Sequence, residues 1–365
     1  MRILAVDVGT GTQDILYFDS DLELENCPQL VMPSPTVIVA ERIRRATGAG
    51  QAVLLTGVTM GGGPSHWAAM DHLRAGLPLF ALAEAAQTFD DDLDSVARMG
   101  VQVVSADEVR ALRDVARCDL KDFYYDAVVR TLEAFGVSVP PDACAVAVFD
   151  HGAAPPGFSD RVFRFQYLAE RVRAGLAAFA FRRDAVPPAM TRLRAVVATA
   201  PAVSDLLVMD TGPAAVLGAL EDPAVRQAER ALVTNIGNFH VLAFHLWHDE
   251  IVGLFEHHTG EVTASQLETL LQRLAEGTLT NEEVYGTQGH GALVLDQVRS
   301  AAEPPLLAVT GPRRALLAAA RWRPYWAVPH GDMMLTGCFG LLRAYAAHDE
   351  RVREAVERRM GRAGA

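Results

Sequence analysis

The stretch AVDVGTGTQDILYF (residues 5–18) places a polar, glycine-rich turn between two apolar segments. The first segment carries Asp7 near its end, the turn is GTGT (residues 9–12), and Gln13 and Asp14 precede the second segment. Glycines in such a hairpin let backbone N–H groups converge on an anion, because no Cβ atoms stand in the way. Asp7 cannot favour a bare phosphate, but a carboxylate can hold a hydrated Mg²⁺ ion that bridges the two charges. The stretch therefore predicts either a phosphate-binding hairpin or an ordinary turn formed by Asp and Thr.

The composition predicts a globular protein with two domains. Half of the 365 residues are hydrophobic, and a chain of this length exceeds one average core. The net charge of −12 argues against nucleic acid and against an anionic membrane surface as general partners. Lys121 is the only lysine among 33 lysine and arginine residues, so it is the one candidate for any role that needs an ammonium group.

The cysteine pattern and the chain's N-terminal segment favour a cytoplasmic protein. Cys27, Cys118, Cys144 and Cys338 are far apart in the sequence, so the spacing supports neither a zinc finger nor an iron–sulfur cluster built from local ligands. A reducing compartment fits this usage. The first residues enter a strand without a basic segment and a long apolar run, so we expect no signal peptide. Apolar stretches are interrupted well short of about 18 residues, so we expect no membrane span.

The rest of the chain alternates between helical and strand patterns. Apolar runs and turn signals predict helices at 37–46 and 169–180, and strands at 52–56, 101–104, 145–149, 195–200 and 206–209. From residue 231 the pattern restarts with three strands, of which the first two are joined by a tight turn at 235–238. Each half of the chain thus opens with a strand, a polar glycine turn and a returning strand. This repetition suggests two similar α/β lobes.

Four further segments carry glycine where close backbone approach is expected. TNIGNFH (residues 234–240) is a second strand–turn–strand element, and LLAVTGPRRALLA (306–318) is a buried strand followed by a glycine turn and a helix start. The second of these can receive a nucleotide base or ribose, or simply turn the chain. VMDTGPAAVLGAL (208–220) and GDMMLTGCFGLLRA (331–344) put Gly and Ala at helical spacing. Small residues at that spacing predict close helix–helix contact, either as core packing or at a hinge.

Five segments, taken in their order along the chain, resemble the five nucleotide-binding motifs of the actin, sugar-kinase and heat-shock-chaperone superfamily. AVDVGTGTQDIL resembles the first phosphate motif, MDTGPAAVLGAL the first connecting helix, VTNIGNFHVLAF the second phosphate motif, LAVTGPRRALL the adenosine motif, and GDMMLTGCFGLLRA the second connecting helix. Residues 20–205 match no motif of that superfamily. The resemblance implies an α/β fold of two ribonuclease-H-like lobes, the actin-like ATPase fold, with a nucleotide cleft between residues 1–209 and residues 210–365.

The resemblance also implies the ligands, which are ATP and Mg²⁺, and the residues that hold them. Asp7 would hold the hydrated metal ion, the two hairpin turns would grip the phosphates from opposite sides, and the turn at Gly311 would lie under the adenosine. The implied cofactor-binding residues are Gly9, Thr10, Gly11, Thr12, Gln13, Gly237, Asn238, Gly311, Pro312 and Gly337.

One position departs from the pattern of the superfamily. The second phosphate motif there usually starts with an Asp, and this sequence has Asn235. Asn cannot take a proton as a general base or add charge to a metal site. Asp14, Asp210 or Glu256 could substitute for it. The sequence is thus compatible with a phosphotransferase or ATPase acting on a small molecule, or with a nucleotide-sensing or partner-binding protein that lacks turnover.

The pair DVGTGTQD and MDTGPAAVLGAL is similar, more narrowly, to a family often labelled putative pyruvate formate-lyase activating enzyme. Such an enzyme needs a radical-generating iron–sulfur cluster held by closely spaced cysteines. This sequence has no such spacing, so we do not expect that chemistry.

Histidines beside glycines form a separate hypothesis. His151, His257, His258, His290 and His330 lie near predicted strand ends, where they could converge on a cleft as metal ligands or proton carriers. No pair has the helical spacing of a local metal site, and we prefer the interpretation that they are separate polar residues at loop mouths. His257 or His258 is the best single candidate for a functional histidine, which adds His257 to the candidate catalytic residues Asp7, Asp14, Asn235 and Glu256.

The remaining motif is GVTMGGGPSHW (residues 57–67), with three successive glycines, Gly61 to Gly63, before a predicted helix start. A helix N-terminus of this kind can bind the anionic group of a substrate. The glycines can equally be a flexible turn, and we slightly favour the functional interpretation.

Overall fold

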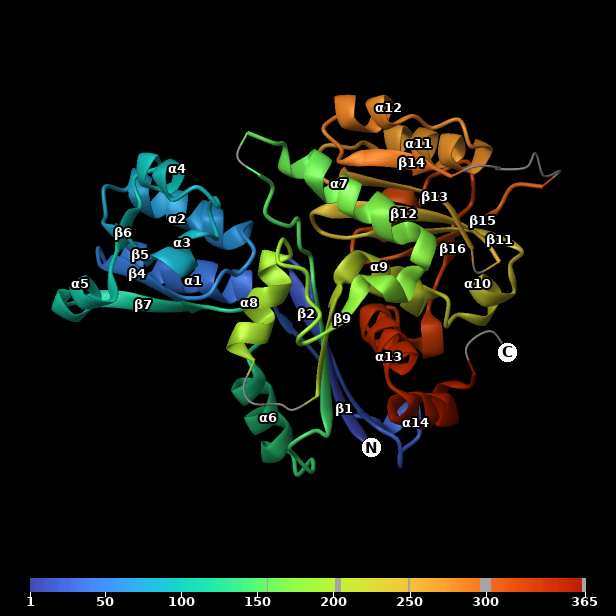
Figure 1. Ribbon diagram of the computed structural model, residues 1–365, viewed down its shortest axis with the longest axis horizontal. Helices are drawn as coiled ribbons and strands as arrows, with labels where there is room; N and C mark the ends of the chain where they lie inside the picture. The colour runs from blue at the N-terminus through green and yellow to red at the C-terminus, as the bar shows by residue number, and fades with distance from the viewer. Residues whose placement is uncertain (156, 201–204, 249, 296–302, 363–365) are drawn as a thin grey trace.

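The computed structural model describes residues 1–155, 157–200, 205–248, 250–295 and 303–362, and shows a mixed α/β protein with three sheets (Figure 1). Residues 156 and 201–204 of the predicted first lobe, and residues 249, 296–302 and 363–365 of the predicted second lobe, therefore lie outside the described residues. No helix within these ranges is both long enough and apolar enough to cross a bilayer.

The first sheet has six strands in the order β3-β2-β1-β8-β10-β9. The strands β1, β2 and β3 form an antiparallel meander, β8 and β10 run parallel to β1, and β9 is an antiparallel edge strand. Buried apolar residues dominate the central strands, as expected when both faces of a sheet are covered. The bounds are β1 (Arg2–Val8), β2 (Thr12–Asp19), β3 (Gln29–Pro33), β8 (Ala143–Val148), β9 (Ala180–Arg182) and β10 (Leu206–Asp210).

The second sheet has the order β14-β13-β12-β11-β15-β16. Its strand β11 pairs with an antiparallel hairpin partner, β12, on one side and with a parallel strand, β15, on the other. This repeats the order and the strand directions found around β1 in the first sheet. The bounds are β11 (Arg230–Ile236), β12 (His240–Trp247), β13 (Glu250–His258), β14 (Gly291–Val294), β15 (Leu306–Thr310) and β16 (Tyr325–Trp326).

The third sheet is all parallel, has the order β6-β5-β4-β7, and lies between β3 and β8 in the chain. Figure 1 shows it with its helices at the left, away from the second sheet, and a separate cluster of buried apolar residues forms its core. The elements are α1 (Pro35–Gly48), β4 (Ala52–Gly57), α2 (Pro64–Arg74), β5 (Leu79–Leu82), α3 (Ala83–Ala86), α4 (Leu93–Arg98), β6 (Gln102–Val104), α5 (Ala106–Ala111) and β7 (Val115–Leu120).

Two helices rich in small residues, α9 (Thr211–Ala219) and α13 (Thr336–His348), pack against each other near the centre of the molecule (Figure 1). A Cβ atom added at Gly218 would overlap the carbonyl oxygen of Thr336, and one added at Gly340 would overlap the carbonyl oxygen of Ala214. The prediction of close helix–helix contact at these small residues is therefore confirmed, and the structure shows that the two helices make this contact with each other.

Other helices cover the sheets and connect their strands. They are α6 (Tyr125–Ala134), α7 (Asp160–Arg171), α8 (Thr191–Thr199), α10 (Pro223–Gln227), α11 (Ala264–Glu276), α12 (Asn281–Gly286) and α14 (Glu350–Met360).

Three local predictions differ from the structure. Of the helix predicted at 169–180, only residues 169–171 are α-helical, at the end of α7. The chain continues as two 3₁₀ turns, Val172–Ala174 and Leu176–Phe179, which are separated by Gly175 with a φ of 84°. The strand predicted at 195–200 belongs to α8, where Leu193 and Val196 are buried on one helical face. The helix predicted after Gly311 is only a 3₁₀ turn, Arg314–Leu317.

A buried ion-pair network anchors the C-terminal end of the fold. Glu221 is paired with Arg343 at 2.7 Å and with Arg226 at 2.9 Å, and His330 Nε2 lies 3.4 Å from it. Burial alone would raise the pKa of Glu221, but the hydrogen bonds from His330 and Arg343 outweigh it and lower the pKa to about 2.

We expect this depressed pKa to show as acid-dependent stability. The contribution of ionised Glu221 is fully present above its unfolded pKa, about 4.5, and is lost as the pH falls through the folded value. The difference in free energy of unfolding between the wild type and Glu221→Gln should thus shrink by about 2 kcal/mol from about pH 5 to about pH 3. Urea titrations at both pH values measure it, and parallel pH profiles for the two proteins would contradict it.

Candidate functional site

A cleft lies where the hairpin turn between β1 and β2 meets the turn between β11 and β12. The two turns are in direct contact, because a Cβ atom added at Gly11 would lie 2.5 Å from Asn238 Nδ2. The residues that line the cleft include Asp7, Val8, Gly9, Thr10, Thr12, Asp14, Phe149, Arg192, Thr211, Gly212, Asn235, Gly237, Asn238, Phe239, His240, Thr310, Gly311, Pro312, Met333, Met334 and Gly337.

Both turns are held in place by a hydroxyl group from a neighbouring element. Ser34, at the start of α1, donates to the carbonyl oxygen of Thr10 at 2.6 Å. Thr259, just after β13, donates to the carbonyl oxygen of Gly237 at 2.8 Å. Because these bonds fix the carbonyl groups, each turn keeps one shape before any ligand arrives, which lowers the cost of binding.

Asp7 lies near the end of β1, at the base of the cleft. The hydroxyl of Thr211 donates to its Oδ1 at 2.6 Å. The backbone of Gly337 packs so closely on the carboxylate that an added Cβ would overlap Oδ2 and lie 2.9 Å from the Cβ of Asp7. Burial is the main cause that raises the pKa of Asp7 to about 6. The site is therefore shaped around one oriented carboxylate.

Asp14 faces Asp7 across the hairpin, since the two are register partners in β1 and β2. Burial and the neighbouring charge of Asp7 raise the pKa of Asp14 to about 8. Its Oδ1 is buried and has no hydrogen-bond partner in the part of the chain that the structure describes. Mg²⁺ usually keeps several waters and is bound through one or two carboxylates, so Asp7 and Asp14 offer ligands of the kind that such an ion takes.

The opposite end of the cleft is less polar. Gly311 adopts a φ of 96°, and a Cβ atom there would lie 2.5 Å from Asn235 Oδ1. Pro312, Met333 and Met334 line the same end. A flat, mostly apolar group would fit against these side chains, with the glycine backbone close to it.

Most of the predicted site residues come together in the cleft. Those that line it are Asp7, Asp14, Asn235, Gly9, Thr10, Thr12, Gly237, Asn238, Gly311, Pro312 and Gly337. Gly11 lies behind this wall in contact with Asn238, and the side chain of Gln13 points into the sheet, where Nε2 donates to Pro33 at 2.9 Å.

The structure does not bring Glu256 or His257 to the cleft. Glu256 is fully buried and ion-paired with Arg164. His257 is also fully buried, and its Nε2 lies 3.2 Å from the hydroxyl of Thr287. Successive residues of a strand point to opposite faces, so the one-residue step between them decides which environment each meets. Neither side chain lies where it could substitute for the missing Asp of the second hairpin.

Arg192 is a cleft residue that the sequence did not indicate. Its guanidinium is held by Asp122, with Nη2 at 2.6 Å, and by the carbonyl of Phe149 at 2.8 Å. The prediction of a strand at 195–200 hid its position at the start of helix α8. Arg192 thus brings a guanidinium group, ion-paired with Asp122, to the cleft wall.

The loop Gly61 to Gly63 lies against residues that line the cleft without lining it itself. Cβ atoms added there would lie 2.5 Å from Arg192 Nη1 at Gly61, and 3.3 Å from both Phe239 and Thr10 at Gly63. The glycines therefore allow this loop to pack tightly over the cleft wall.

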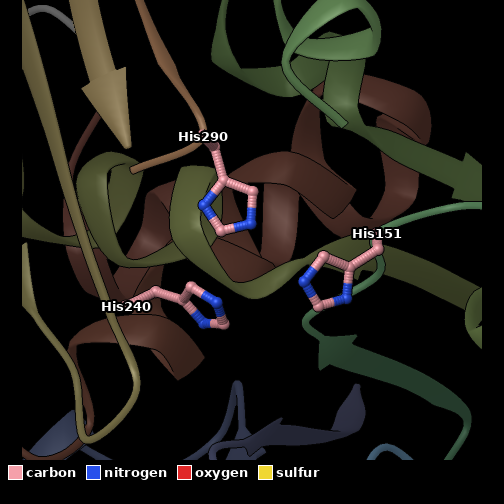
Figure 2. A group of neighbouring side chains, drawn as sticks. All are labelled: His151, His240 and His290. Carbon is pink, nitrogen blue, oxygen red and sulfur yellow. The ribbon is translucent and has the colours of Figure 1, made fainter. Parts of the chain in front are cut away.

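Three histidines gather beside the cleft. Figure 2 shows that His151, His240 and His290 point toward a common space. One ring nitrogen of each lies within 4.8 Å of one ring nitrogen of each of the others. The His258 ring lies 4.6 Å from that of His290. His330 is elsewhere, beside Glu221. The preferred interpretation of separate histidines is therefore wrong for this group, and His257 is not a member of it.

His240 was missed as a candidate although it ends the quoted segment TNIGNFH. It lines the cleft and its ring stacks on that of Phe149 at 4.0 Å. Burial, with neighbouring histidine and arginine charges, lowers the pKa of His290 to about 2 and that of His151 to about 3. These imidazoles are therefore neutral at physiological pH.

Comparison with known proteins gives one family and two distant structures. A family model described as "Putative pyruvate format-lyase activating enzyme (DUF1786)" matches residues 60–316. No curated protein matches the chain. Among solved structures, an exopolyphosphatase-like protein is 8% identical, with a TM-score of 0.28, covering 100% of this chain and 92% of that one.

The second similar structure is acetone carboxylase in its nucleotide-free form, an enzyme of ATP-dependent acetone carboxylation. It is 11% identical with a TM-score of 0.21, and the match covers 69% of this chain and 45% of that one. Scores this low do not establish a shared fold.

Proposed function

We propose that this chain, which belongs to the family described as "Putative pyruvate format-lyase activating enzyme (DUF1786)", binds a magnesium nucleotide in the cleft between the two hairpin turns. ATP is the leading candidate. The observation that carries the proposal is the meeting of the turns at Gly11 and Asn238, with the carboxylate of Asp7 beneath them. The repeated strand order around β1 and β11 supports the finer proposal of an actin-like fold with lobes at residues 1–209 and 210–365.

In this proposal the phosphates lie between the turns. Backbone and hydroxyl groups of residues 9–12 contact them from one side, and Gly237 and Asn238 from the other. Asp7, oriented by Thr211, holds the hydrated Mg²⁺, which neutralises phosphate charge. The base and ribose lie at the apolar end, over Gly311 and Pro312, where the chain approaches without a side chain.

Turnover depends on a group that accepts a proton from the attacking hydroxyl or water. Asn235 cannot do so. Asp14 can, because its carboxylate lines the cleft and burial raises its pKa to about 8, which makes it a stronger base than an ordinary Asp once it is ionised. We propose phosphoryl transfer to a small molecule, or hydrolysis, with Asp14 as the base. Asn235 favours the second candidate function, a nucleotide sensor without turnover.

We do not propose the radical iron–sulfur chemistry that the family description implies. Such a cluster requires several converging cysteine thiolates. Cys27, Cys118, Cys144 and Cys338 are all buried and unpaired. Among the described residues, the three histidines are the one group of at least three His, Cys, Asp or Glu side chains whose donor atoms converge. The donor set does not fit a cluster.

Asp7→Asn is expected to weaken Mg·ATP binding at least about tenfold, or about 1.4 kcal/mol. The substitution keeps the shape of the side chain and removes the charge that holds the metal ion. Isothermal titration with ATP and ADP, each with Mg²⁺, measures the loss. Asp21→Asn, an exposed acid in the loop after β2, is the matched control and should bind like the wild type. Absence of binding heat for both nucleotides with the folded wild type would refute the proposal.

A further inference from the structure

The three histidines beside the cleft come from three separate segments. His151 follows β8, His240 begins β12, and His290 precedes β14. The rings turn toward one another (Figure 2). Side chains from segments so far apart in sequence meet at one point only because the tertiary fold brings them there.

Several polar atoms of this group have no partner. His290 is 1% exposed, and within the described ranges neither of its ring nitrogens has a hydrogen-bond partner. His240 Nε2 is likewise buried and unpartnered there. A buried nitrogen without a hydrogen bond is costly in free energy, so a cluster of them indicates that a bound species completes the site.

A carboxylate stands behind the group. Glu256 Oε1 lies 3.6 Å from His290 Nδ1, and this oxygen is also buried and without a hydrogen-bond partner among the described residues. The other oxygen, Oε2, is held by Arg164 Nε at 3.1 Å. A histidine that binds a metal ion through one nitrogen usually donates its other N–H to such a carboxylate. The arrangement leaves His290 Nε2 free to face the centre of the group.

We propose that His151, His240 and His290 bind a divalent transition-metal ion of the zinc class, and that Glu256 orients His290 by accepting a hydrogen bond from Nδ1. Three neutral imidazoles suit zinc and similar ions better than Mg²⁺, which prefers oxygen ligands. The site is distinct from the Asp7 site and does not rest on nucleotide binding. Three protein ligands leave a fourth position for a substrate oxygen, and His240 places that position at the edge of the cleft.

The geometry allows this ion with small movements. A tetrahedral ion with metal–nitrogen bonds of about 2.1 Å requires neighbouring nitrogens about 3.4 Å apart. One ring nitrogen of each histidine lies within 4.8 Å of those of the other two, so each side chain has to approach the centre by about an ångström or less. Phe149 stacks on the ring of His240, and the buried Glu256 lies beside His290. These two neighbours limit how far the two histidines can move.

The test uses the full chain, freed of metal by a chelator and titrated with Co²⁺, whose tetrahedral complexes absorb visible light. We expect about one Co²⁺ per chain with a tetrahedral spectrum, displaced by Zn²⁺. His290→Asn and His151→Asn should both lose the spectrum. His151 lies at a loop and His290 in the interior, so the first variant keeps the test valid if the second does not fold. Glu256→Gln should keep the spectrum with affinity lowered about 10–100-fold.

Two controls separate this site from other metal sites. His348→Asn removes an exposed histidine at the end of α13 and should bind Co²⁺ like the wild type. Asp7→Asn should keep the tetrahedral spectrum while losing nucleotide affinity, so failure of one proposal is distinguishable from failure of the other. A folded wild type without stoichiometric binding, or an unchanged spectrum in folded His151→Asn, would overturn the inference.

Discussion

Gly340→Ala is expected to lower the free energy of unfolding by at least about 3 kcal/mol. A Cβ atom at this position of α13 would overlap the carbonyl oxygen of Ala214 and lie 2.8 Å from the backbone nitrogen of Gly218, both in α9. Backbone atoms cannot swing aside as the end of a side chain can. The two helices would have to separate, and their packing in the main core would be lost. Urea denaturation of both proteins measures the change.

Gly48→Ala is the matched control for this substitution. Gly48 is also within a helix, α1, and an added Cβ would have no atom within 4 Å. Since alanine has a higher helix propensity than glycine by up to about 1 kcal/mol, this variant should be as stable as the wild type or slightly more stable. Equal effects at positions 48 and 340 would show that the closeness of α9 and α13 is not what makes glycine necessary.

Segments with strong local signals were predicted well. Each of the two hairpins, β1–β2 and the one with its turn at 235–238, combines apolar strand segments with a glycine turn. The helices α9 and α13 combine an apolar sequence with small residues at helical spacing. Few other structures are compatible with such combinations. The region of the third sheet was not predicted as a sheet of its own. Its strands are short, and its parallel pairing joins β4 to β7 across about sixty residues, a long-range choice that local patterns do not encode.

The residues of the candidate site likewise fall into two groups, those that local sequence patterns indicate and those that depend on tertiary contacts. The sequence indicated Asp7, Gly9 and Gly237 because a hairpin turn places its residues at the ends of its strands, independently of the rest of the fold. Arg192 and His240 depend on contacts between distant segments, and the sequence around them carries no local sign of that. Glu256 was predicted on the correct strand, but its role depends on which face it occupies and on the partner it meets there, Arg164.

Arg164 is the cation between two buried carboxylates, those of Asp210 and Glu256. Arg164→Met is expected to lower the free energy of unfolding by about 3–5 kcal/mol. Its guanidinium is fully buried, pairs with both oxygens of Asp210, and donates to Glu256 at 3.1 Å and to the carbonyl of Asp150 at 3.1 Å. Methionine fills similar space but leaves two buried carboxylates without a counter-charge. Removing one partner of a buried ion pair costs far more than a surface pair is worth.

The pH dependence identifies the cause of this loss. Burial raises the pKa of Glu256 to about 7 even though the charge of Arg164 lowers it, so removal of Arg164 should raise it further. A group whose folded pKa exceeds its unfolded pKa loses stability as the pH rises between the two values. The gap in stability between wild type and Arg164→Met should therefore widen from about pH 6 to about pH 8, because the wild-type loss is nearly complete near pH 7.

Two variants make this prediction specific. Arg194→Met changes an exposed arginine of another helix, α8, whose Nη1 contacts only the carbonyl of Pro188 at 3.4 Å among the described residues, and should be close to neutral. Arg164→Met combined with Glu256→Gln should recover part of the lost stability and remove the widening with pH, since one of the two stranded charges is gone. A loss that is independent of pH, and equal in the single and double variants, would mean that packing around Arg164 and not its charge stabilises this core.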